Sequence, residues 1–149
     1  MTVSAATTAD LADLSRLFAG YLHFYQVPRD RADVAAFLGA RLQLGDSRLF
    51  IARDEHGVAQ GFVQLYPFHS SLALEPAWLL SDLYVDKSVR RRGVGEALMN
   101  AARAHAEATG ACGLQLETAK TNLAGQHLYE RLGYVRDEQF FTYWLALNR

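Results

Sequence analysis

The chain has 149 residues, of which 50% are hydrophobic, enough for one substantial core but not for two ordinary domains, so we expect a single domain over residues 1–149. Its formal net charge of −1 argues against a general nucleic-acid binder, and the lone Cys112 excludes an intrachain disulfide framework and suits a reducing compartment. Because the sequence has no leader and no apolar run of the ~18 residues that cross a bilayer, we expect a soluble, cytoplasmic protein without membrane contact.

The N-terminal part of the chain carries the patterns of one strand and two helices. Residues 1–6 predict a short edge strand, and cap-forming residues then precede a helix over about residues 9–24. Pro28 breaks the chain, and a second helix begins at Asp30 or Arg31. In both helices the apolar residues recur at the spacing of one helix face, which predicts that each helix covers a core.

A strand pair is expected next. Residues 48–53 predict a strand, 54–57 a hairpin turn, and 58–66 the partner strand. Pro67 should end that strand because proline lacks the amide hydrogen of a sheet ladder. Residues 68–76 are then expected to form an irregular loop.

The most informative stretch begins with an apolar strand over residues 79–85. After it come three adjacent arginines and two glycines, and from Val94 the apolar residues follow one helix face. The first amides of a helix lack internal partners and carry its positive dipole end, and glycines let a ligand approach the backbone. The P-loop pattern is absent, and the dinucleotide fingerprint fails because Leu98 stands where its third glycine would be. The stretch therefore predicts a polyphosphate-binding turn of another kind.

The C-terminal part predicts a strand, a helix and a last strand. Residues 114–118 alternate as a strand does, and a helix follows from Asn122, with Gly133 where a C-terminal cap is expected. Residues 139–147, rich in Phe, Tyr and Trp, predict the final strand. The expected element order is β-αα-βββ-α-β-α-β.

Two motifs together resemble a known family. Arg90-x-x-Gly93-x-Gly95 is similar to the coenzyme A signature of the Gcn5-related N-acetyltransferases (GNAT), and residues 122–134 resemble that family's closing motif, Asn-x-x-Ala/Gly-x-x-x-Tyr-x-x-x-Gly-Phe/Tyr. The resemblance implies an α/β fold, a mixed and mostly antiparallel sheet flanked by helices. It also implies acetyl-CoA as co-substrate. The layout is closest to bacterial small-amine and polyamine acetyltransferases.

The resemblance also implies which residues contact the cofactor. In that family the strand before the turn and the strand after its helix splay apart, and the pantetheine arm pairs with the backbone of the first strand. For Asn122, capping of its helix is an equally good explanation. The expected cofactor-binding residues are Leu83, Tyr84, Val85, Arg90, Arg91, Arg92, Gly93, Val94, Gly95, Glu96, Asn122 and Gly125.

Acetyl transfer needs a neutral amine, donors for the developing oxyanion and a proton for the departing thiolate. Tyr129 matches the family's helix tyrosine and is the candidate acid, and an exposed amide near Tyr84 or Val85 is the candidate oxyanion donor. Ser81 stands where polyamine-acetylating members commonly have a glutamate, and a serine can order a water but cannot act as a base near neutral pH. Asp82 is the candidate base or substrate-binding acid if a bulge turns it toward the cleft, and a purely structural pairing would also explain it.

The acceptor side has four candidate residues, namely Ser81, Tyr21, Tyr25 and Trp78. Tyr21 and Tyr25 lie between the first two helices, which border the acceptor site in the family. Their rings suit a cationic amine, and core packing would also account for them. Trp78 is the candidate opposite wall. The five histidines show no ligand spacing, so no metal site is expected.

These observations favour an N-acetyltransferase that moves an acetyl group directly from acetyl-CoA to a primary amine, such as that of a polyamine or diamine. A protein N-terminus or lysine is the alternative acceptor, and a non-catalytic acyl-CoA-binding or assembly module is the alternative without turnover. The aromatic strand at 139–147 would expose apolar surface at a sheet edge, so we also expect a homodimer. No nucleic-acid or membrane partner is expected.

Overall fold

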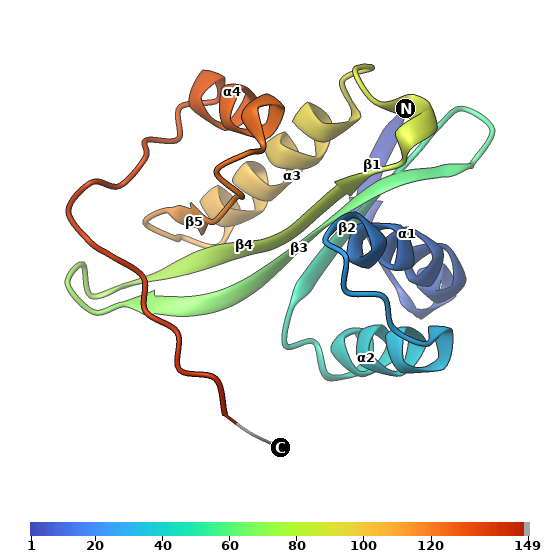
Figure 1. Ribbon diagram of the computed structural model, residues 1–149, viewed down its shortest axis with the longest axis horizontal. Coiled ribbons are helices and arrows are strands. Elements are labelled where there is room, and N and C mark those ends of the chain that lie inside the picture. The colour runs from blue at the N-terminus through green and yellow to red at the C-terminus, as the bar shows by residue number, and fades with distance from the viewer. Residues whose placement is uncertain (148–149) are drawn as a thin grey trace. The chain divides into compact units, whose positions relative to one another are not determined.

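The computed structural model describes residues 1–147, which form two compact units, residues 1–117 and the residues from Thr118 onward. The first unit contains a five-stranded sheet in the order β1-β2-β3-β4-β5 (Figure 1). Neighbouring strands from β1 to β4 are antiparallel, whereas β5 runs parallel to β4, so the expected mixed, mostly antiparallel sheet is confirmed. The strands are β1 Thr2–Ala5, β2 Arg48–Arg53, β3 Ala59–Ser70, β4 Glu75–Val85 and β5 Leu114–Leu116.

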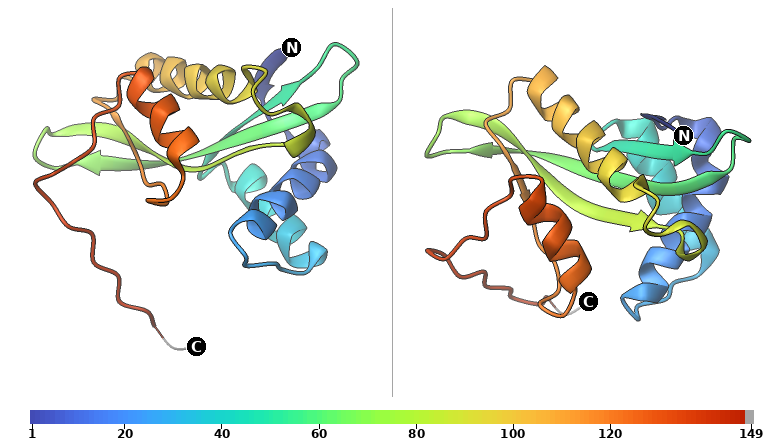
Figure 2. Two further views of the ribbon diagram at one scale, coloured as in Figure 1. Left: turned by 45° about the horizontal axis from the view of Figure 1, so that its top comes forward. Right: turned by 90° about the horizontal axis from the view of Figure 1, so that it is seen from above.

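Three helices cover the two faces of this sheet. Figure 2 shows α3 on one face and both α1 and α2 on the other. The buried residues of α1 and α3 face the strands, whereas α2 packs mainly on α1 and adds Val34 and Leu38 to the same core. The helices are α1 Leu11–Phe24, α2 Arg31–Leu44 and α3 Val94–Ala108, and a 3₁₀ turn, Thr8–Asp10, leads into α1.

The core beneath α1 and α2 is built from both layers. Leu17 and Leu38 from the helices pack with Ile51 and Phe62 from the strands, and all four side chains are almost fully buried. Burial of one such side chain contributes about 1.5–3 kcal/mol. Tyr84 of β4 packs on the rim of this cluster, which connects the core to the edge of the sheet described below.

The pairing of β3 with β4 extends further than the sequence predicts. Pro67 does not end β3 but lies within it, opposite Trp78, and the loop expected over residues 68–76 is mostly paired strand. The Trp78 amide donates to the Gly113 carbonyl on the β5 side. In the Pro67–Trp78 pair the backbone N–H and C=O positions therefore point away from the facing strand. The Pro67 nitrogen therefore points to the other edge of β3, where pairing with β2 has ended at Leu65. A missing amide hydrogen costs nothing there.

The second unit is built around α4, Leu123–Arg131. Gly133 follows it with φ +97°, a left-handed conformation that glycine adopts without strain. The final strand expected over residues 139–147 is wrong, because no strand pairing occurs among the described residues after β5. An aromatic, alternating pattern suits a strand, but a strand also needs a partner for its backbone, and that stretch has none within residues 1–147.

Candidate functional site

The register between β3 and β4 shifts in the middle of the pair. Gln64 pairs with Asp82 and Leu65 pairs with Leu80, so Ser81 is an extra residue on β4. A bulge of this kind changes which face the following side chains occupy. Trp78 and Leu80 lie on the face covered by α3, whereas Asp82 receives a hydrogen bond from Tyr21 of α1. The bulge on which the expectation for Asp82 depended is therefore present.

The edge of β4 beyond the bulge is open on the side of β5. Pairing with β5 ends at Leu80. On the opposite side the Asp86 amide donates to the Gln60 carbonyl at 2.8 Å, so the peptide groups of Leu83 and Val85 point away from β3. Among residues 1–147 no strand pairs with this stretch. An extended ligand can therefore bind here as an added strand.

The turn from β4 to α3 presents a helix N-terminus together with cationic side chains. Arg91 and Gly93 both have left-handed backbone conformations, with φ +67° and +82°. α3 begins at Val94, and Gly93 before it has no side chain to cap the first amides. The side chains of Arg91 and Arg92 are exposed. The positive end of the helix dipole and two guanidinium groups suit a polyphosphate.

Arg90 differs from the two arginines that follow it. Its Nε donates to the Val85 carbonyl at 3.1 Å, and its guanidinium lies over the rings of Phe24 and Tyr84, 5.7 and 5.6 Å from their centroids. The side chain thus braces the open end of β4 against α1. This position favours a supporting role for Arg90 beside its expected contact with the cofactor.

Asp82 lies in a hydrogen-bonded group on the α1 and α2 face. Gln64 Nε2 donates to its Oδ2 at 2.9 Å, and the Tyr21 and Ser81 hydroxyls also hydrogen-bond to the carboxylate. The Tyr21 hydroxyl is 3.5 Å from the Ser81 carbonyl oxygen as well. Burial raises the pKa of Asp82 above its ordinary value, against the effect of these donors. The structure thus brings together Asp82, Ser81 and Tyr21, three residues that the sequence singled out.

Two neighbours of Asp82 were missed by sequence reasoning. Gln64 is fully buried, and Tyr66, two residues further along β3, has its pKa raised to about 12 by burial and by the charge of Asp82. A polar residue at a buried strand position is an indication of a network, because a buried amide needs partners. Gln64 between Val63 and Leu65 carried that indication in the sequence.

The aromatic residues of the acceptor side divide into two groups. The Tyr25 ring contacts the Tyr21 ring edge-on at 5.0 Å and remains exposed, at the end of α1. Trp78 instead is buried on the α3 face, where its Nε1 donates to Thr109 at 2.9 Å and its ring packs on His105. The structure therefore does not bring Trp78 to Asp82.

The second unit holds the remaining candidates. Asn122 caps α4, since its Oδ1 accepts from the Gly125 amide at 3.1 Å while its Nδ2 donates to Thr118. A Cβ on Gly125 would collide with the Asn122 side chain, so a glycine is needed there. The Tyr129 ring lies 6.3 Å from the Tyr134 ring, centroid to centroid.

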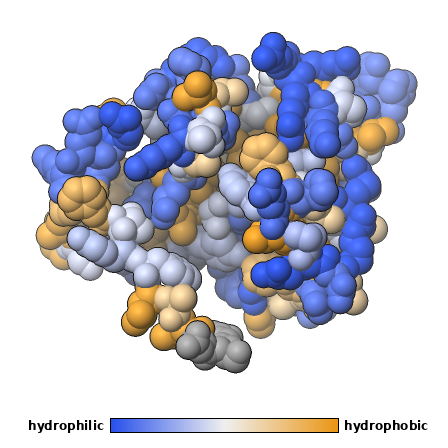
Figure 3. Space-filling model, viewed as in Figure 1, coloured by the Kyte–Doolittle hydropathy of each residue, from blue (hydrophilic) through white to orange (hydrophobic). Residues whose placement is uncertain are grey.

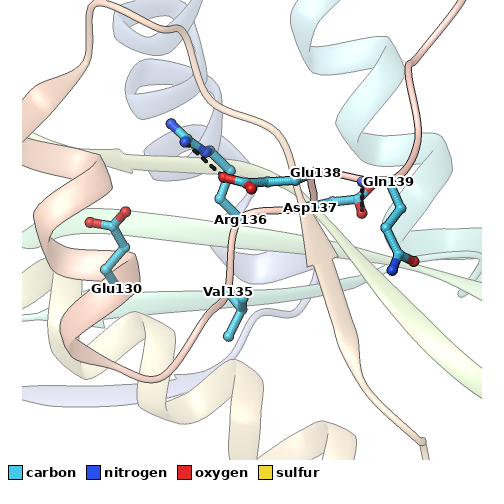
Figure 4. A pocket seen from close by; sticks show the side chains of 6 residues that line it. All are labelled: Glu130, Val135, Arg136, Asp137, Glu138 and Gln139. Carbon is cyan, nitrogen blue, oxygen red and sulfur yellow. Dashed lines mark hydrogen bonds and ion pairs between the residues drawn. The ribbon is translucent and has the colours of Figure 1, made fainter.

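A polar hollow lies beside the end of α4 (Figure 4), with an Arg136–Glu138 ion pair at 3.1 Å. It includes none of the residues expected from the sequence. The lining residues are Glu130, Val135, Arg136, Asp137, Glu138 and Gln139.

Over residues 1–147 no three His, Cys, Asp or Glu side chains lie close enough together to hold a metal ion. None of the helices described for this chain has the length and apolar character needed to cross a membrane.

Comparisons with known proteins match this chain to acetyltransferases. The model of the acetyltransferase (GNAT) family matches residues 14–134. An uncharacterised N-acetyltransferase of Bacillus subtilis (strain 168), YhfO, is 39% identical over 145 residues, which is 97% of each chain. The crystal structure of a probable acetyltransferase has a TM-score of 0.93 at 34% identity, covering 100% of this chain and 99% of that one. An aminoglycoside N-acetyltransferase in complex with CoA has a TM-score of 0.83 at 22% identity, over 98% and 95%, which is a likeness of fold.

Proposed function

Because the chain belongs to the acetyltransferase (GNAT) family, we propose that it moves an acetyl group directly from acetyl-CoA to a primary amine of a small molecule. The observation that carries this proposal is the open edge of β4 next to the Ser81 bulge. A donor can bind along that edge, and the bulge turns Asp82 to the face of α1. One short stretch of backbone thus offers a donor site and an acceptor site.

The residues of the first unit fit the parts of acetyl-CoA. The outward peptide groups of Leu83 and Val85 suit the amides of its pantetheine arm. The N-terminus of α3, over residues 93–96, with Arg91 and Arg92 suits its pyrophosphate. Acetyl-CoA supplies the reactive thioester carbonyl. The Tyr84 amide, one of the two expected near this point, faces β3 in its pair with Phe62, so in our proposal the amide of Val85 or of the neighbouring Leu83 stabilises the oxyanion. Asn122 contacts the pantetheine in addition to capping α4.

The proton transfers fall to two side chains. An alkylamine is largely protonated near neutral pH and must lose a proton before it attacks. Asp82 receives that proton, directly or through a water held by Ser81, because burial raises the pKa of its carboxyl. Tyr129 gives a proton to the departing thiolate. Tyr21 and Tyr25 form the aromatic wall beside the amine.

We also propose that the protein is a homodimer. The segment 140–145 exposes most of its aromatic and aliphatic surface, with Tyr143 and Trp144 each 90% exposed. Figure 3 shows apolar side chains at the surface just before the end of the described chain. A second copy of the chain is the partner that would cover them.

The first experiment is detection of acetylated product by mass spectrometry. The protein is mixed with acetyl-CoA and a panel of polyamines, diamines, amino acids, aminoglycosides and lysine or N-terminal peptides. Acetylation of one class of small amine supports the proposal and identifies the acceptor. Acetylation of peptides alone contradicts the small-molecule part. No product from any acceptor, with acetyl-CoA bound in the same sample, favours a non-catalytic acyl-CoA-binding module.

Two variants separate binding from turnover. Arg92→Glu should weaken acetyl-CoA binding at least about tenfold, because it reverses a charge at the pyrophosphate site. Arg103→Glu is the matched control, since that arginine lies further along α3 and, among residues 1–147, pairs with Glu107 on the helix surface. Equal effects of the two variants on the Kd, measured by calorimetry, would contradict the assignment of the turn.

Tyr129→Phe tests the acid. It should lower kcat by about 10²–10⁴-fold while the Kd for acetyl-CoA stays nearly the same, because only the phenolic proton is removed. An unchanged kcat would remove Tyr129 from the mechanism.

A further inference from the structure

A buried polar chain connects β2, β3 and β4 beneath the acceptor side. The Ser47 hydroxyl, just before β2, donates to Gln64 Oε1 at 2.9 Å, and Gln64 Nε2 donates to Asp82 Oδ2 at 2.9 Å. Gln64 is 0% exposed and Ser47 is 6% exposed. Burial of an amide is costly unless both of its ends are hydrogen-bonded, and here both are.

The hydrogen bonds of this polar chain fix the direction in which the Gln64 amide points. A carboxylate can only accept hydrogen bonds, so the amide must offer it the NH₂ end. Ser47 occupies the opposite end of the amide with its hydroxyl proton. Rotating the amide by 180° would set its oxygen against a carboxylate oxygen. The carboxylate thus fixes Gln64 as a donor to Asp82, and the Ser47 hydroxyl satisfies and anchors the oxygen end of the same amide.

Among residues 1–147, Asp82 has neutral hydrogen-bond donors but no cation paired with it. Its hydrogen-bond partners are Gln64, Tyr21 and Ser81. The charge of Arg41, from α2, lowers the pKa of the neighbouring Tyr66, but this guanidinium is already ion-paired with Asp46, with Nε 2.8 Å from Oδ1. No ion pair to Asp82 occurs among the side chains of residues 1–147. A partly buried carboxylate without a counter-ion is a place where a ligand's cation would be stabilised.

We infer that Gln64, held by Ser47, is a positioning residue that keeps the Asp82 carboxylate oriented toward an alkylammonium group of the acceptor. This role depends on the proposed acetyl transfer and narrows its acceptor to amines that arrive as cations. Gln64 acts through Asp82 and does not itself touch the amine. Amines that are neutral at pH 7, such as arylamines, lack the charge that Asp82 would bind and should be poor acceptors.

The test compares two variants, each of which removes a different hydrogen bond of the Ser47–Gln64–Asp82 network. Gln64→Leu removes the donor to Asp82, and Ser47→Ala removes the hydrogen bond that anchors the oxygen end of the Gln64 amide. Because a hydrogen bond to a charged group contributes about 1.5–3 kcal/mol, Gln64→Leu should raise the KM for an alkylamine roughly 10- to 100-fold. The acid limb of the kcat/KM profile should move to higher pH, since loss of a donor raises the pKa of Asp82. Ser47→Ala should act in the same direction with a smaller effect, and the KM for acetyl-CoA should not change.

The chain offers a matched control for the serine variant. Ser15 of α1 is also 6% exposed, and its hydroxyl has no hydrogen-bond partner among the described residues. Ser15→Ala therefore removes a buried hydroxyl without touching the network and should leave both the KM and the pH profile unchanged.

The outcomes separate this inference from the proposed function. A folded Gln64→Leu or Ser47→Ala variant with unchanged amine KM and unchanged acid limb overturns the positioning role. Absence of turnover with every amine contradicts the proposed function instead. In that case a carbon-detected NMR titration of Asp82 still tests the positioning. A pKa that rises in Gln64→Leu supports it, and an unchanged pKa overturns it.

Discussion

Asp82 carries a stability cost that follows from its place in the site. Burial raises the pKa of its carboxyl in the folded chain above the ordinary value of 3.8. The folded state then binds this proton more tightly than the unfolded state does, so this contribution to stability falls as the pH rises through the folded-state pKa. The cost is fully present at neutral pH and disappears below about pH 3.8.

Asp82→Asn should therefore stabilise the fold while it impairs transfer. The Tm at pH 7 should rise by about 2–4 °C for each kcal/mol of cost removed, and the gain should shrink as the pH approaches 4. Thermal unfolding at several pH values measures the gain, and the amine assay measures the loss of kcat/KM. A variant that is less stable than the wild type at pH 7 would contradict this account.

The site residues show what a single sequence can and cannot predict. Asp82, Ser81 and Tyr21 were expected near the acceptor, and the structure brings them together. Trp78 was expected as the opposite wall of the acceptor site, but the bulge at Ser81 turns Asp82 to the α1 face and leaves Trp78 under α3. Gln64 was missed because its partners are distant in sequence, at Ser47 and Asp82.

At the scale of the elements, α1 and β4 are in direct contact, and a glycine in α1 makes this close approach possible. A Cβ on Gly20 would lie 2.6 Å from the Tyr84 hydroxyl, so the Tyr84 ring rests directly on the helix backbone. The same ring carries the Arg90 guanidinium, which holds the Val85 carbonyl. The position of the open edge of β4 thus depends on a glycine in α1.

Gly20→Ala should displace that ring. Overpacking typically costs about 1–3 kcal/mol, which exceeds the gain of up to about 1 kcal/mol from the higher helix propensity of alanine. We expect a lower Tm and weaker acetyl-CoA binding, measured by thermal unfolding and calorimetry.

Gly39→Ala in α2 is the matched control for this prediction. A Cβ there would have only an ordinary contact, 3.7 Å from Leu11 Cδ2, so the substitution should raise the Tm. If Gly20→Ala stabilises the protein as Gly39→Ala does, α1 does not position β4 in this way.

The element boundaries that were mispredicted depend on neighbouring strands. The bulge at Ser81 exists because β4 has one more residue than the stretch of β3 opposite it, and nothing within β4 reveals that count. Pro67 is tolerated because the pairing of β3 with β2 stops at Leu65, opposite the first residue of β2. Both features are properties of a pair of strands, whereas β2 and the helices, which local spacing defines, were predicted closely.

At the scale of the whole molecule, segment 140–145 is unusual because its apolar side chains are exposed to solvent instead of buried. Phe141 and Trp144 are 88% and 90% exposed. Burial of one aromatic ring covers about 150–250 Å², and complete burial of a Phe side chain contributes about 1.5–3 kcal/mol. We therefore expect a dimer at micromolar concentration in sedimentation velocity, and Phe141→Ser with Trp144→Ser should shift it to monomer.

Leu72→Ser is the control, because Leu72 is 97% exposed at the tip of the β3–β4 turn and its loss should leave the dimer intact. A monomeric wild type, or a dimer that the double substitution does not weaken, would show that a second copy does not cover this segment.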